Sequence, residues 1–464
     1  MHTPFLIDFP YRDDSADLFE ALADRSWAMF LDSGRPHGAQ GRYDILVAEP
    51  VVTLVTRGAV TETRHGDTVE HSADDPLALL RTVLARYQSV ETALPFAGGA
   101  VGYFSYDLGR RFERVPTLAA DVEQLPEMAV GIYDWAVVVD HVAQRSWFVG
   151  QRSDAAAAEH YRILAAQFRQ PIARRARPAL RLRAALQTSL DRSAYGAAFR
   201  RLLEYIGAGD CYQVNLAQRF SAPVEGDAWA GYRALRVLNP APCSAYLNTP
   251  DAQVLSASPE HFLRVREGVV ETRPIKGTRP RHADAAIDRR RANELLASAK
   301  DRAENVMIVD LLRNDLGKVC RFGSVQTQEL CALESFATVH HLVSTVRGEL
   351  AAGRDALDVL RACFPGGSIT GAPKIRAMQI IEELERERRG VYCGAIGYIG
   401  FDGAMELNIA IRTLVHSHGQ VRFWAGGGIV ADSIEEAEYQ ETLDKAAAMF
   451  ALLRAPASRA AGSG

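Results

Sequence analysis

Apolar runs rich in β-branched and aromatic residues recur through the first third of the chain and constrain its fold more than any other feature. Residues 44–57 and the alternating stretch 59–63 predict a β-hairpin, and an amphipathic helix follows over 76–89. The stretches 97–107 and 128–150 have a similar composition and predict further strands. We therefore expect this part of the chain to be mostly β-sheet with helices attached.

The length predicts two domains or one large composite domain, because 464 residues exceed the size at which a single hydrophobic core stops growing. Prolines and arginines gather over 170–190, which marks a domain boundary, although the apolar residues there are equally typical of a short edge strand. We expect an N-terminal region over 1–185, a C-terminal region over 186–455 and a disordered tail over 456–464.

Composition excludes several classes of protein. Hydrophobic residues make up 48% and charged residues 24% of the chain, which is typical of a globular protein. A formal net charge of -4 gives no reason to expect nucleic acid or an anionic membrane as a partner. The six cysteines lack zinc-ligand or redox spacing, and no apolar run approaches the roughly 18 residues of a membrane span. We expect a cytoplasmic protein.

A single lysine stands out in the run 273–280, Arg-Pro-Ile-Lys-Gly-Thr-Arg-Pro. Lys276 is followed by Gly277, where the backbone can bend and a ligand can approach closely. Glu260 lies 16 positions upstream in another β-like run, and a polar turn near 267–268 separates the two. The two runs, as neighbouring β elements, would bring acid and amine together. The alternative is a surface lysine beside a proline-rich turn.

Carboxylates also recur on a helix predicted over 288–312. Asp301 and Glu304 are three positions apart and therefore lie on one face. The alternative is a solvated helix face, on which these carboxylates pair with Lys300 or Arg302.

The glycine-rich run 364–374 leads into a helix predicted over 374–386. A P-loop would need Lys and then Ser or Thr directly after Gly371, and Ala372-Pro373 stand there instead, so a nucleotide-phosphate cradle is excluded. Free backbone N–H groups at a helix start suit a small anion, including a carboxylate. A plain helix N-cap fits this pattern equally well.

A second glycine run, 426–428, precedes a helix that ends near 454. Ser433 with Glu436 three positions later predicts a capping box at the start of this helix.

The same helix presents Glu438, Glu441 and Lys445 on a face distinct from its apolar stripe. Two helices that each offer carboxylates three positions apart, with no His or Cys in register, suit Mg²⁺.

Ordered motifs between residues 193 and 454 resemble those of the chorismate-utilising enzyme family, which contains anthranilate, isochorismate and salicylate synthases. The matching runs are 209–215, 258–260, 274–278, 301–305, 340–342, 366–374, 397–400, 411–413 and 426–442. The resemblance implies an α+β fold in which large mixed or antiparallel β-sheets pack as a sandwich with helices outside, as in component I of anthranilate synthase.

Two positions separate the chemistries within this family. In the run that contains Lys276 here, anthranilate synthases have a sequence similar to Pro-Ile-Ala-Gly-Thr, with alanine in place of the lysine. At the position of Gln213, the water-adding members carry a lysine that acts as a base. The resemblance therefore implies the branch that aminates chorismate with ammonia to 4-amino-4-deoxychorismate, the precursor of p-aminobenzoate and folate. The nearest rival is anthranilate synthase component I, and a catalytically silent regulatory homologue is disfavoured because every carboxylate and the lysine are present.

The resemblance also implies roles for individual residues. Lys276 attacks chorismate, Glu260 acts as general acid, and His341 supports the ring, with a packed histidine as its alternative. The implied Mg²⁺ ligands are Glu304 and Glu441, with Glu438 through water. The implied substrate contacts are Gln213, Thr370, Gly371, Tyr398, Arg412, Gly427, Gly428 and Lys445.

Ammonia requires a source. A glutamine amidotransferase needs a cysteine in a Gly-X-Cys-X-Gly elbow, and Cys393 has Val391 where the first glycine belongs. We therefore expect a separate glutamine amidotransferase subunit as partner.

The N-terminal third matches the family mainly at 31–34, 42–44 and 102–103. In anthranilate synthases the equivalent of Ser33 belongs to a tryptophan pocket, and relatives of the aminating branch can hold tryptophan structurally. The resemblance implies a bound tryptophan held by Ser33, Tyr43 and Asp44, although Asp32 stands where the inhibitor motif has glutamate. The alternative is a packed core.

Overall fold

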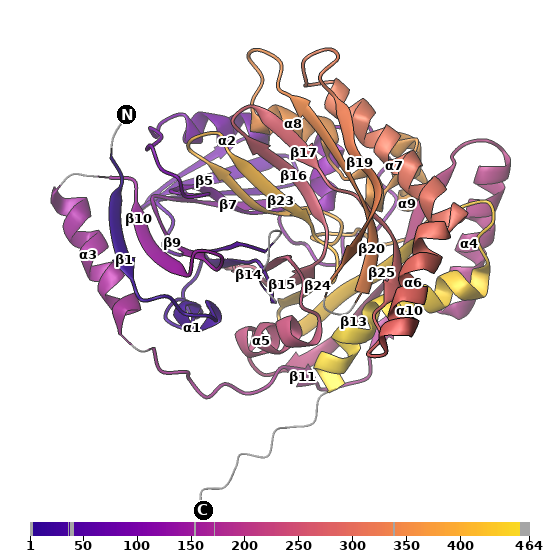
Figure 1. Cartoon of the computed structure of the whole chain (residues 1–464), viewed down its shortest axis with the longest axis horizontal. Helices are drawn as coiled ribbons and strands as arrows, with labels where there is room; N and C mark the ends of the chain where they lie inside the picture. Colours follow the sequence, from indigo (N-terminus) through magenta and orange to yellow (C-terminus); the bar gives the residue numbers. More distant parts are fainter. Residues whose placement is uncertain are drawn as a thin grey trace, which may run out of the picture.

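The computed structural model describes residues 3–35, 37, 41–152, 155–170, 172–336 and 339–454. The tail expected over 456–464 lies outside these residues. Two large β-sheets face each other, and helices cover their outer sides (Figure 1). The predicted sandwich of large antiparallel sheets with helices outside is confirmed.

The first sheet has thirteen strands among the described residues, and all its pairings are antiparallel. In sheet order its strands are β1 (Phe5–Phe9), β10 (Arg145–Gly150), β9 (Trp135–Asp140), β3 (Tyr43–Val47), β2 (Ala28–Asp32), β14 (Cys243–Asn248), β15 (Gln253–Ser258), β24 (Thr413–Ser417), β25 (Gln420–Ile429), β13 (Gln213–Glu225) and β11 (Arg181–Leu182). The short strands β12 (Gln187–Thr188) and β21 (Gly371–Ala372) also pair with β13.

The second sheet has twelve described strands, again antiparallel. In order they are β18 (Ile275–Pro280), β20 (Val339–Glu349), β17 (Val269–Thr272), β16 (His261–Arg266), β23 (Met405–Ile409), β22 (Ala395–Gly400), β7 (Gly99–Phe104), β8 (Met128–Tyr133), β4 (Val52–Arg57), β5 (Val60–His65) and β6 (Thr68–Ser72). Strand β19 (Gln326–Ser335) pairs with β20.

Both sheets take strands from either side of residue 185. In the first sheet β2 pairs with β14, and in the second sheet β7 pairs with β22. The proline- and arginine-rich stretch 170–190 contains the short strands β11 and β12, which pair with β13.

The described helices lie mainly on the outer faces of the sheets (Figure 1). They are α1 (Ala16–Phe19), α2 (Pro76–Leu84), α3 (Ala155–Arg169), α4 (Arg192–Gly207), α5 (Ala228–Leu238), α6 (Ala285–Ala297), α7 (Ala299–Gly317), α8 (Ala356–Cys363), α9 (Lys374–Leu384) and α10 (Glu435–Arg454). Two 3₁₀ turns, η1 (Tyr106–Arg111) and η2 (Gly367–Ile369), complete the set. No described helix is long and apolar enough to cross a membrane.

The hydrophobic core is layered. Met29 and Ile45 of the first sheet share one cluster with Val101 and Ile396 of the second, so this cluster fills the space between the sheets. A second cluster joins the outer face of the first sheet to α3, α5 and α10, and a third joins the second sheet to α2 and α8. Burial on both faces explains why the strands read as nearly continuous apolar runs.

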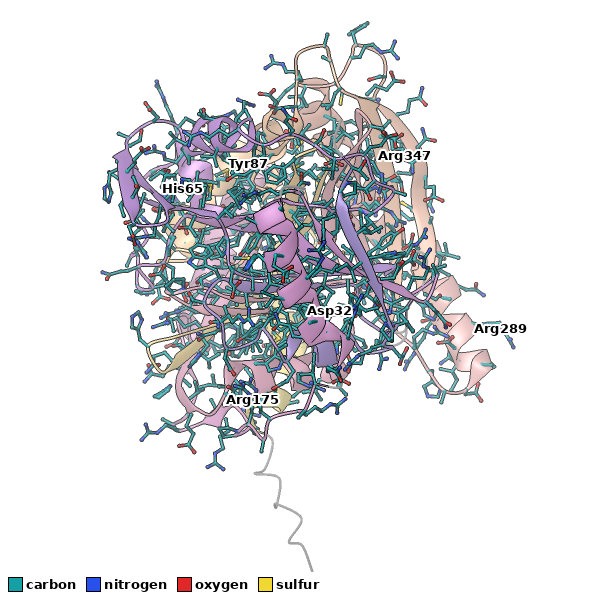
Figure 2. The ribbon with its side chains drawn as sticks, turned by 90° about the vertical axis from the view of Figure 1, so that its left-hand side faces the viewer. Asp32, His65, Tyr87, Arg175, Arg289 and Arg347 are labelled. Atoms are coloured by element: carbon teal, nitrogen blue, oxygen red, sulfur yellow. The ribbon has the colours of Figure 1, made fainter. Side chains whose placement is uncertain are left out.

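The helix predicted over 288–312 is two helices. Ser298 has extended backbone angles, and its hydroxyl accepts a hydrogen bond of 3.2 Å from the Asp301 amide, so it caps α7 and ends α6. Helix α6 buries only Leu295 and projects from the body, where Figure 2 shows Arg289 at its outer side.

Candidate active site

Lys276 lies in β18, at one edge of the second sheet. The pairing with β20 shifts its register between Lys276 and Thr278, and Gly277 between them has a φ of +78°. A Cβ at Gly277 would lie 3.0 Å from Asp301, so glycine here lets α7 approach the strand. The Lys276 Nζ donates a hydrogen bond of 3.1 Å to the carbonyl oxygen of Ser368. The amine therefore points at the glycine-rich loop.

Glu260 follows β15, and its side chain is buried. Burial raises the pKa of its carboxyl, whereas a hydrogen bond from the Ser368 side chain and the charge of Lys276 lower it. The acid and the amine thus share one site, as predicted. Their strands are arranged differently from the expectation, because β20 lies between β17 and β18. The polar turn at 267–268 joins β16 to β17 only.

The surroundings of Lys276 favour the neutral amine. Burial lowers the pKa of Lys276, the carboxylates of Glu304 and Glu260 oppose this change, and the charge of Lys445 adds to it. A lowered pKa increases the fraction of neutral amine near pH 7, and only the neutral amine is a nucleophile.

Three glutamates from two helices meet beside this lysine. Glu304 belongs to α7, whereas Glu438 and Glu441 belong to α10. A Cβ at Gly427 would lie 3.1 Å from Glu441 Oε1 and 3.2 Å from Glu438 Oε2, so both carboxylates lie over the same point of β25. The Lys300 Nζ lies 3.9 Å from Glu304 Oε1 and 3.8 Å from Glu438 Oε1 and links the two helices.

This donor set suits a hard divalent cation. All three groups are carboxylates, and a Cβ at Gly427 would crowd two of them. Within the described parts of the chain, no three His, Cys, Asp or Glu side chains form a ready metal cage. Mg²⁺ does not need one, because it is usually held by one or two carboxylates and keeps several waters. The residues therefore fit Mg²⁺ bound through few protein oxygens.

Two further cations lie at this site. The Lys445 Nζ is 2.5 Å from Glu441 Oε1 and donates to the Gly426 carbonyl at 2.8 Å. Burial by itself would raise the pKa of Glu441. The charge of Lys445 and its hydrogen bond to Glu441 outweigh this effect, so the pKa of Glu441 is lowered. Arg412 donates a hydrogen bond to the Lys445 carbonyl, and burial lowers the pKa of its guanidinium. A ligand that carries carboxylates would meet both cations here.

Gln213 opens β13, and its amide is fully buried. Neither Nε2 nor Oε1 has a hydrogen-bond partner, which is costly for a buried amide unless a ligand or water satisfies it. A Cβ at Gly428 would lie 2.4 Å from Gln213 Nε2, so glycine at 428 makes room for this amide. Gln213 and Gly428 thus lie side by side, and the unpartnered amide is available to a ligand.

The glycine-rich loop closes another side. The Thr370 hydroxyl donates to the Gly366 carbonyl at 2.9 Å, so it supports the loop itself. Gly371 has a φ of +146°, and its Cα lies against the Gln213 carbonyl, where a Cβ would approach to 2.1 Å. Helix α9 begins at Lys374, whose Nζ is bound by Asp315 at 2.5 Å. The Lys374 charge is therefore neutralised within the protein.

His341 lies on β20 opposite Thr278, whose hydroxyl is 2.9 Å from His341 Nδ1. Burial lowers the pKa of His341 to about 4, so the ring is neutral at physiological pH. Its neighbour His340 contacts Ser335 at 2.7 Å and Asp288 at 3.1 Å. His340 is therefore a packed histidine.

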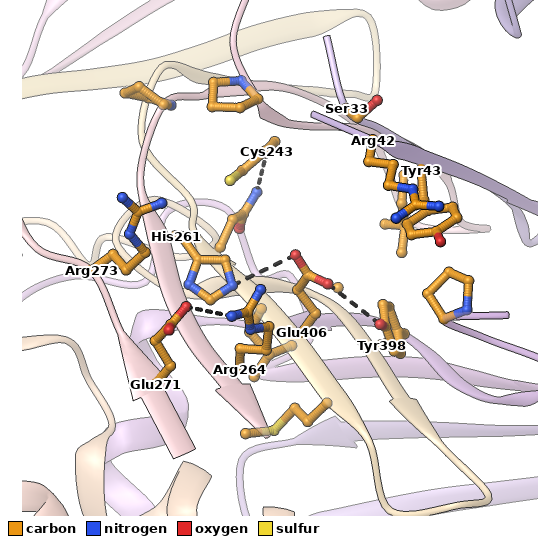
Figure 3. A pocket seen from close by; sticks show the side chains of 18 of the residues that line it. Ser33, Arg42, Tyr43, Cys243, His261, Arg264, Glu271, Arg273, Tyr398 and Glu406 are labelled. Atoms are coloured by element: carbon orange, nitrogen blue, oxygen red, sulfur yellow. Dashed lines mark hydrogen bonds and ion pairs between the residues drawn. The ribbon is translucent and has the colours of Figure 1, made fainter. Parts of the chain in front are cut away.

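The structure places Tyr398 elsewhere than predicted. Its hydroxyl lies 3.4 Å from Glu406 Oε2, and its ring lines a cavity between the two sheets (Figure 3). This cavity has a volume of about 780 Å³, and neither Lys276 nor Arg412 lines it. The sequence motif located the strand correctly, but the alternation of side chains turns Tyr398 toward the space between the sheets.

The same cavity contains two of the three residues predicted to hold tryptophan. Ser33 and Tyr43 line it (Figure 3). Asp44 is not among its lining residues: it is fully buried and accepts hydrogen bonds from the Ser33 amide and hydroxyl, both at 2.7 Å. Its other oxygen lies 2.8 Å from His141 Nε2. Asp44 therefore fixes Ser33 from behind the cavity wall.

Sequence reasoning missed several residues of the site. Ser368 contacts Lys276 through its carbonyl and Glu260 through its hydroxyl. Its position inside the glycine-rich run is the only feature of the sequence that could have indicated this role. Arg389, 1% exposed, donates to the Ile369 carbonyl and to Glu385. Nothing in the sequence separates Arg389 from the other arginines around it, because its role depends on burial.

Comparison with known proteins agrees with this fold. The chain matches the family of chorismate binding enzymes over residues 30–451. It therefore belongs to the chorismate-binding enzyme family.

Within that family it is 51% identical to aminodeoxychorismate synthase component 1 of Klebsiella aerogenes, over 96% of this chain and 98% of the relative. It is 43% identical to anthranilate synthase component 1 of Thermus thermophilus, over 92% and 93%. The crystal structure of anthranilate synthase component I from Streptococcus pneumoniae superposes with a TM-score of 0.80 at 34% identity, covering 89% of this chain and 93% of that one.

Proposed function

We propose that this chain aminates chorismate at C4 with ammonia and releases 4-amino-4-deoxychorismate, as an aminodeoxychorismate synthase component 1 does. The observation that carries the proposal is Lys276, an amine with a lowered pKa beside the buried acid Glu260. The relatives bearing that name support it through their identity to this chain, which reaches 51%.

In the first step the Lys276 nitrogen bonds to C2 of chorismate, and both double bonds of the ring diene shift by one position, so that the second one reaches C4. The C4–O bond breaks, and Glu260, whose pKa is raised by burial, gives its proton to the departing hydroxyl, which leaves as water. The lysine nitrogen loses a proton, which restores Glu260 to its acid form. The result is a covalent adduct between Lys276 and the ring.

In the second step ammonia attacks C4, both double bonds move back, and the C2–N bond to Lys276 breaks, while the proton lost by the ammonia nitrogen passes to the departing lysine nitrogen. Chorismate and ammonia thus yield 4-amino-4-deoxychorismate and water, and the enolpyruvyl group is retained. No residue here is suited to activate water instead, because the buried Gln213 amide is not a base.

The surrounding residues bind and orient the substrate. We assign Arg412 and Lys445 to its carboxylates and the unpartnered Gln213 amide to a polar group of the ring. Glu304 and Glu441, with Glu438 through water, would hold Mg²⁺, which supplies positive charge for a substrate carboxylate. The neutral His341 lies on the strand beside Lys276 and offers a hydrogen bond or an apolar ring face.

Mass spectrometry of the intact protein tests this proposal. After incubation with chorismate and Mg²⁺ but without ammonia, we expect a mass increase equal to chorismate minus water. The Lys276→Ala variant should show none and should lose product formation with ammonium. Unchanged formation of aminated, pyruvate-retaining product by the variant refutes the proposal. A fluorescent aromatic product from the parent protein would identify an anthranilate synthase instead.

We further infer that ammonia reaches this chain from a glutamine amidotransferase subunit, as the designation component 1 of its relatives suggests. Purified protein should then use ammonium salts but not glutamine. Equal turnover of glutamine by this chain alone contradicts a separate subunit.

The cavity lined by Ser33 and Tyr43 is our proposed tryptophan site, with Asp44 holding Ser33 in position. Its wall contains arginines and glutamates as well as aromatic rings, so both charges of an amino acid find partners there. Denaturing the dialysed protein and analysing the released small molecules tests this. Absence of tryptophan from the extract removes the assignment.

A further inference from the structure

Lys300 occupies an unusual place among the carboxylates of the site. It lies in the first turn of α7, and its Nζ is 3.9 Å from Glu304 of the same helix and 3.8 Å from Glu438 of α10. An ordinary surface pair on a helix joins residues of that helix only. The Lys300 ammonium instead lies between two helices, at the carboxylates assigned above to a divalent cation.

Lys300 is freer to move than its partner Glu438. Glu438 is buried, and its Oε1 accepts a hydrogen bond of 2.7 Å from the Ser433 hydroxyl, which fixes that carboxylate. The Lys300 side chain is 54% exposed and has four rotatable bonds, so it can turn toward solvent while the carboxylate stays in place. The third glutamate has its own cation, since Glu441 lies 2.5 Å from Lys445 Nζ. The positive charge beside Glu304 and Glu438 therefore comes from a flexible side chain.

We propose that Lys300 is a displaceable counter-ion of the metal site: its ammonium holds Glu304 and Glu438 together and leaves when a divalent cation binds. The Lys300 ammonium lies between Glu304 and Glu438, in the gap that a divalent cation bound by these carboxylates would occupy, and two cations in that one gap repel each other strongly. Binding of the metal therefore includes the departure of Lys300, and the lysine weakens the apparent affinity. The proposal rests on the proposed function only in taking these carboxylates as the metal site.

The departure of Lys300 has a second consequence. In its absence Glu304 and Glu438 repel each other across the gap between α7 and α10, and a metal removes this repulsion. Lys300 thus stabilises the metal-free protein specifically. It does so without being a metal ligand, because an ammonium has donors and no acceptor.

The test compares Lys300→Gln with Lys318→Gln in the full-length protein without substrate. Lys318 is a matched control: it ends the same helix, is 50% exposed and pairs with Asp315 at 3.0 Å. Binding of Mn²⁺, followed by electron paramagnetic resonance of the free ion, should be about tenfold tighter for Lys300→Gln than for the parent protein. The Lys318→Gln variant should bind like the parent. Equal or weaker binding by Lys300→Gln overturns the proposal.

Thermal unfolding gives an independent readout. In EDTA the Lys300→Gln variant should melt below the parent protein, and saturating Mg²⁺ should remove most of the difference. A deficit that persists with Mg²⁺ contradicts the proposal. If Lys300→Gln does not fold, the Lys300→Arg variant is measured in its place. Because arginine keeps the positive charge, this variant should bind the metal no more tightly than the parent protein. Tighter metal binding by Lys300→Arg overturns the proposal. A parent protein that binds no Mn²⁺ refutes the metal assignment itself, whereas a failure confined to Lys300 leaves the Lys276 adduct unaffected.

Discussion

Replacing Arg389 by methionine should be one of the most damaging single changes in this chain. The guanidinium is buried and makes two hydrogen bonds to Glu385, of 2.8 and 2.6 Å. It also donates to the carbonyls of Ile369 at 2.8 Å and Asn215 at 2.9 Å. One side chain therefore ties the glycine-rich loop to β13 and to α9.

The expected loss follows from these contacts. Removing one partner of a buried ion pair costs about 3–5 kcal/mol, because the other charge is left without compensation. Burial already raises the pKa of Glu385, and Arg389 opposes the rise. Without the arginine the pKa of Glu385 should rise further, and uptake of a proton then limits the cost. We expect Arg389→Met to lose about 4 kcal/mol of unfolding free energy.

Urea unfolding followed by tryptophan fluorescence measures this loss. A double variant, Arg389→Met with Glu385→Gln, should regain about half of it, because no buried charge remains and the new amide still accepts the hydrogen bond from the Ala217 amide. The control is Arg313→Met, which removes an exposed pair with Asp310 and should change stability by less than about 0.5 kcal/mol.

Activity should follow stability. The Ile369 and Asn215 carbonyls flank the residues assigned to catalysis and substrate binding, so the KM for chorismate should rise in surviving Arg389→Met protein. The reasoning is refuted if Arg389→Met lies within about 1 kcal/mol of the parent, or if the double variant is no more stable than the single one.

Three further predictions concern the two sites. Gly428→Ala should raise the KM for chorismate at least about tenfold, because the new Cβ would lie 2.4 Å from Gln213 Nε2. The control Gly207→Ala should leave the KM unchanged, because no atom lies within 4 Å of a Cβ there. Equal effects of the two substitutions would contradict this prediction. Adduct formation should rise with pH and level off below the ordinary lysine pKa of about 10.4, since the pKa of Lys276 is lowered. A rate measured by stopped flow that still rises through a pH of about 10.4 would exclude this. Burial raises the pKa of Asp44, but the hydrogen bond and charge of His141 and the hydrogen bond from Ser33 lower it to about 2. The ionised Asp44 therefore stabilises the folded protein above pH 4, and this stabilisation is lost as the pH falls toward 2. Asp44→Asn should therefore cost about 2 kcal/mol at pH 7, about half of that at pH 3 and little at pH 2 in denaturant titrations, and a pH-independent cost counts against the argument.

Local sequence patterns predicted single elements well and their partners poorly. The run at 273–280 is a strand, as expected, but no local signal indicates that β20, more than 60 positions later, separates it from β17. Ser433 was expected to cap α10 and instead donates to Glu438, because the Glu438 carboxylate lies within its reach. Lys300 was considered only as a surface partner of Glu304, and its contact with α10 is invisible before the helices are placed.

The candidate site was predictable mainly through its resemblance to a family. Motifs brought Lys276, Glu260 and the three glutamates into one site, and the structure places them together. Tyr398 shows the limit of this transfer, because a motif fixes a position along the chain but leaves open which face of a strand the side chain takes. Asp44 shows the same limit, since it lies one layer behind the cavity wall.

The exchange of strands between the two ends of the chain has a consequence for its synthesis. β7 obtains its neighbour β22 only after nearly 300 further residues have left the ribosome, and β2 waits more than 200 residues for β14. Until then their open edges and apolar faces have no native cover, and such nascent segments are targets for chaperones. Truncated versions of this protein should consequently accumulate as aggregates, and a functional half cannot be obtained by cutting the chain near its middle.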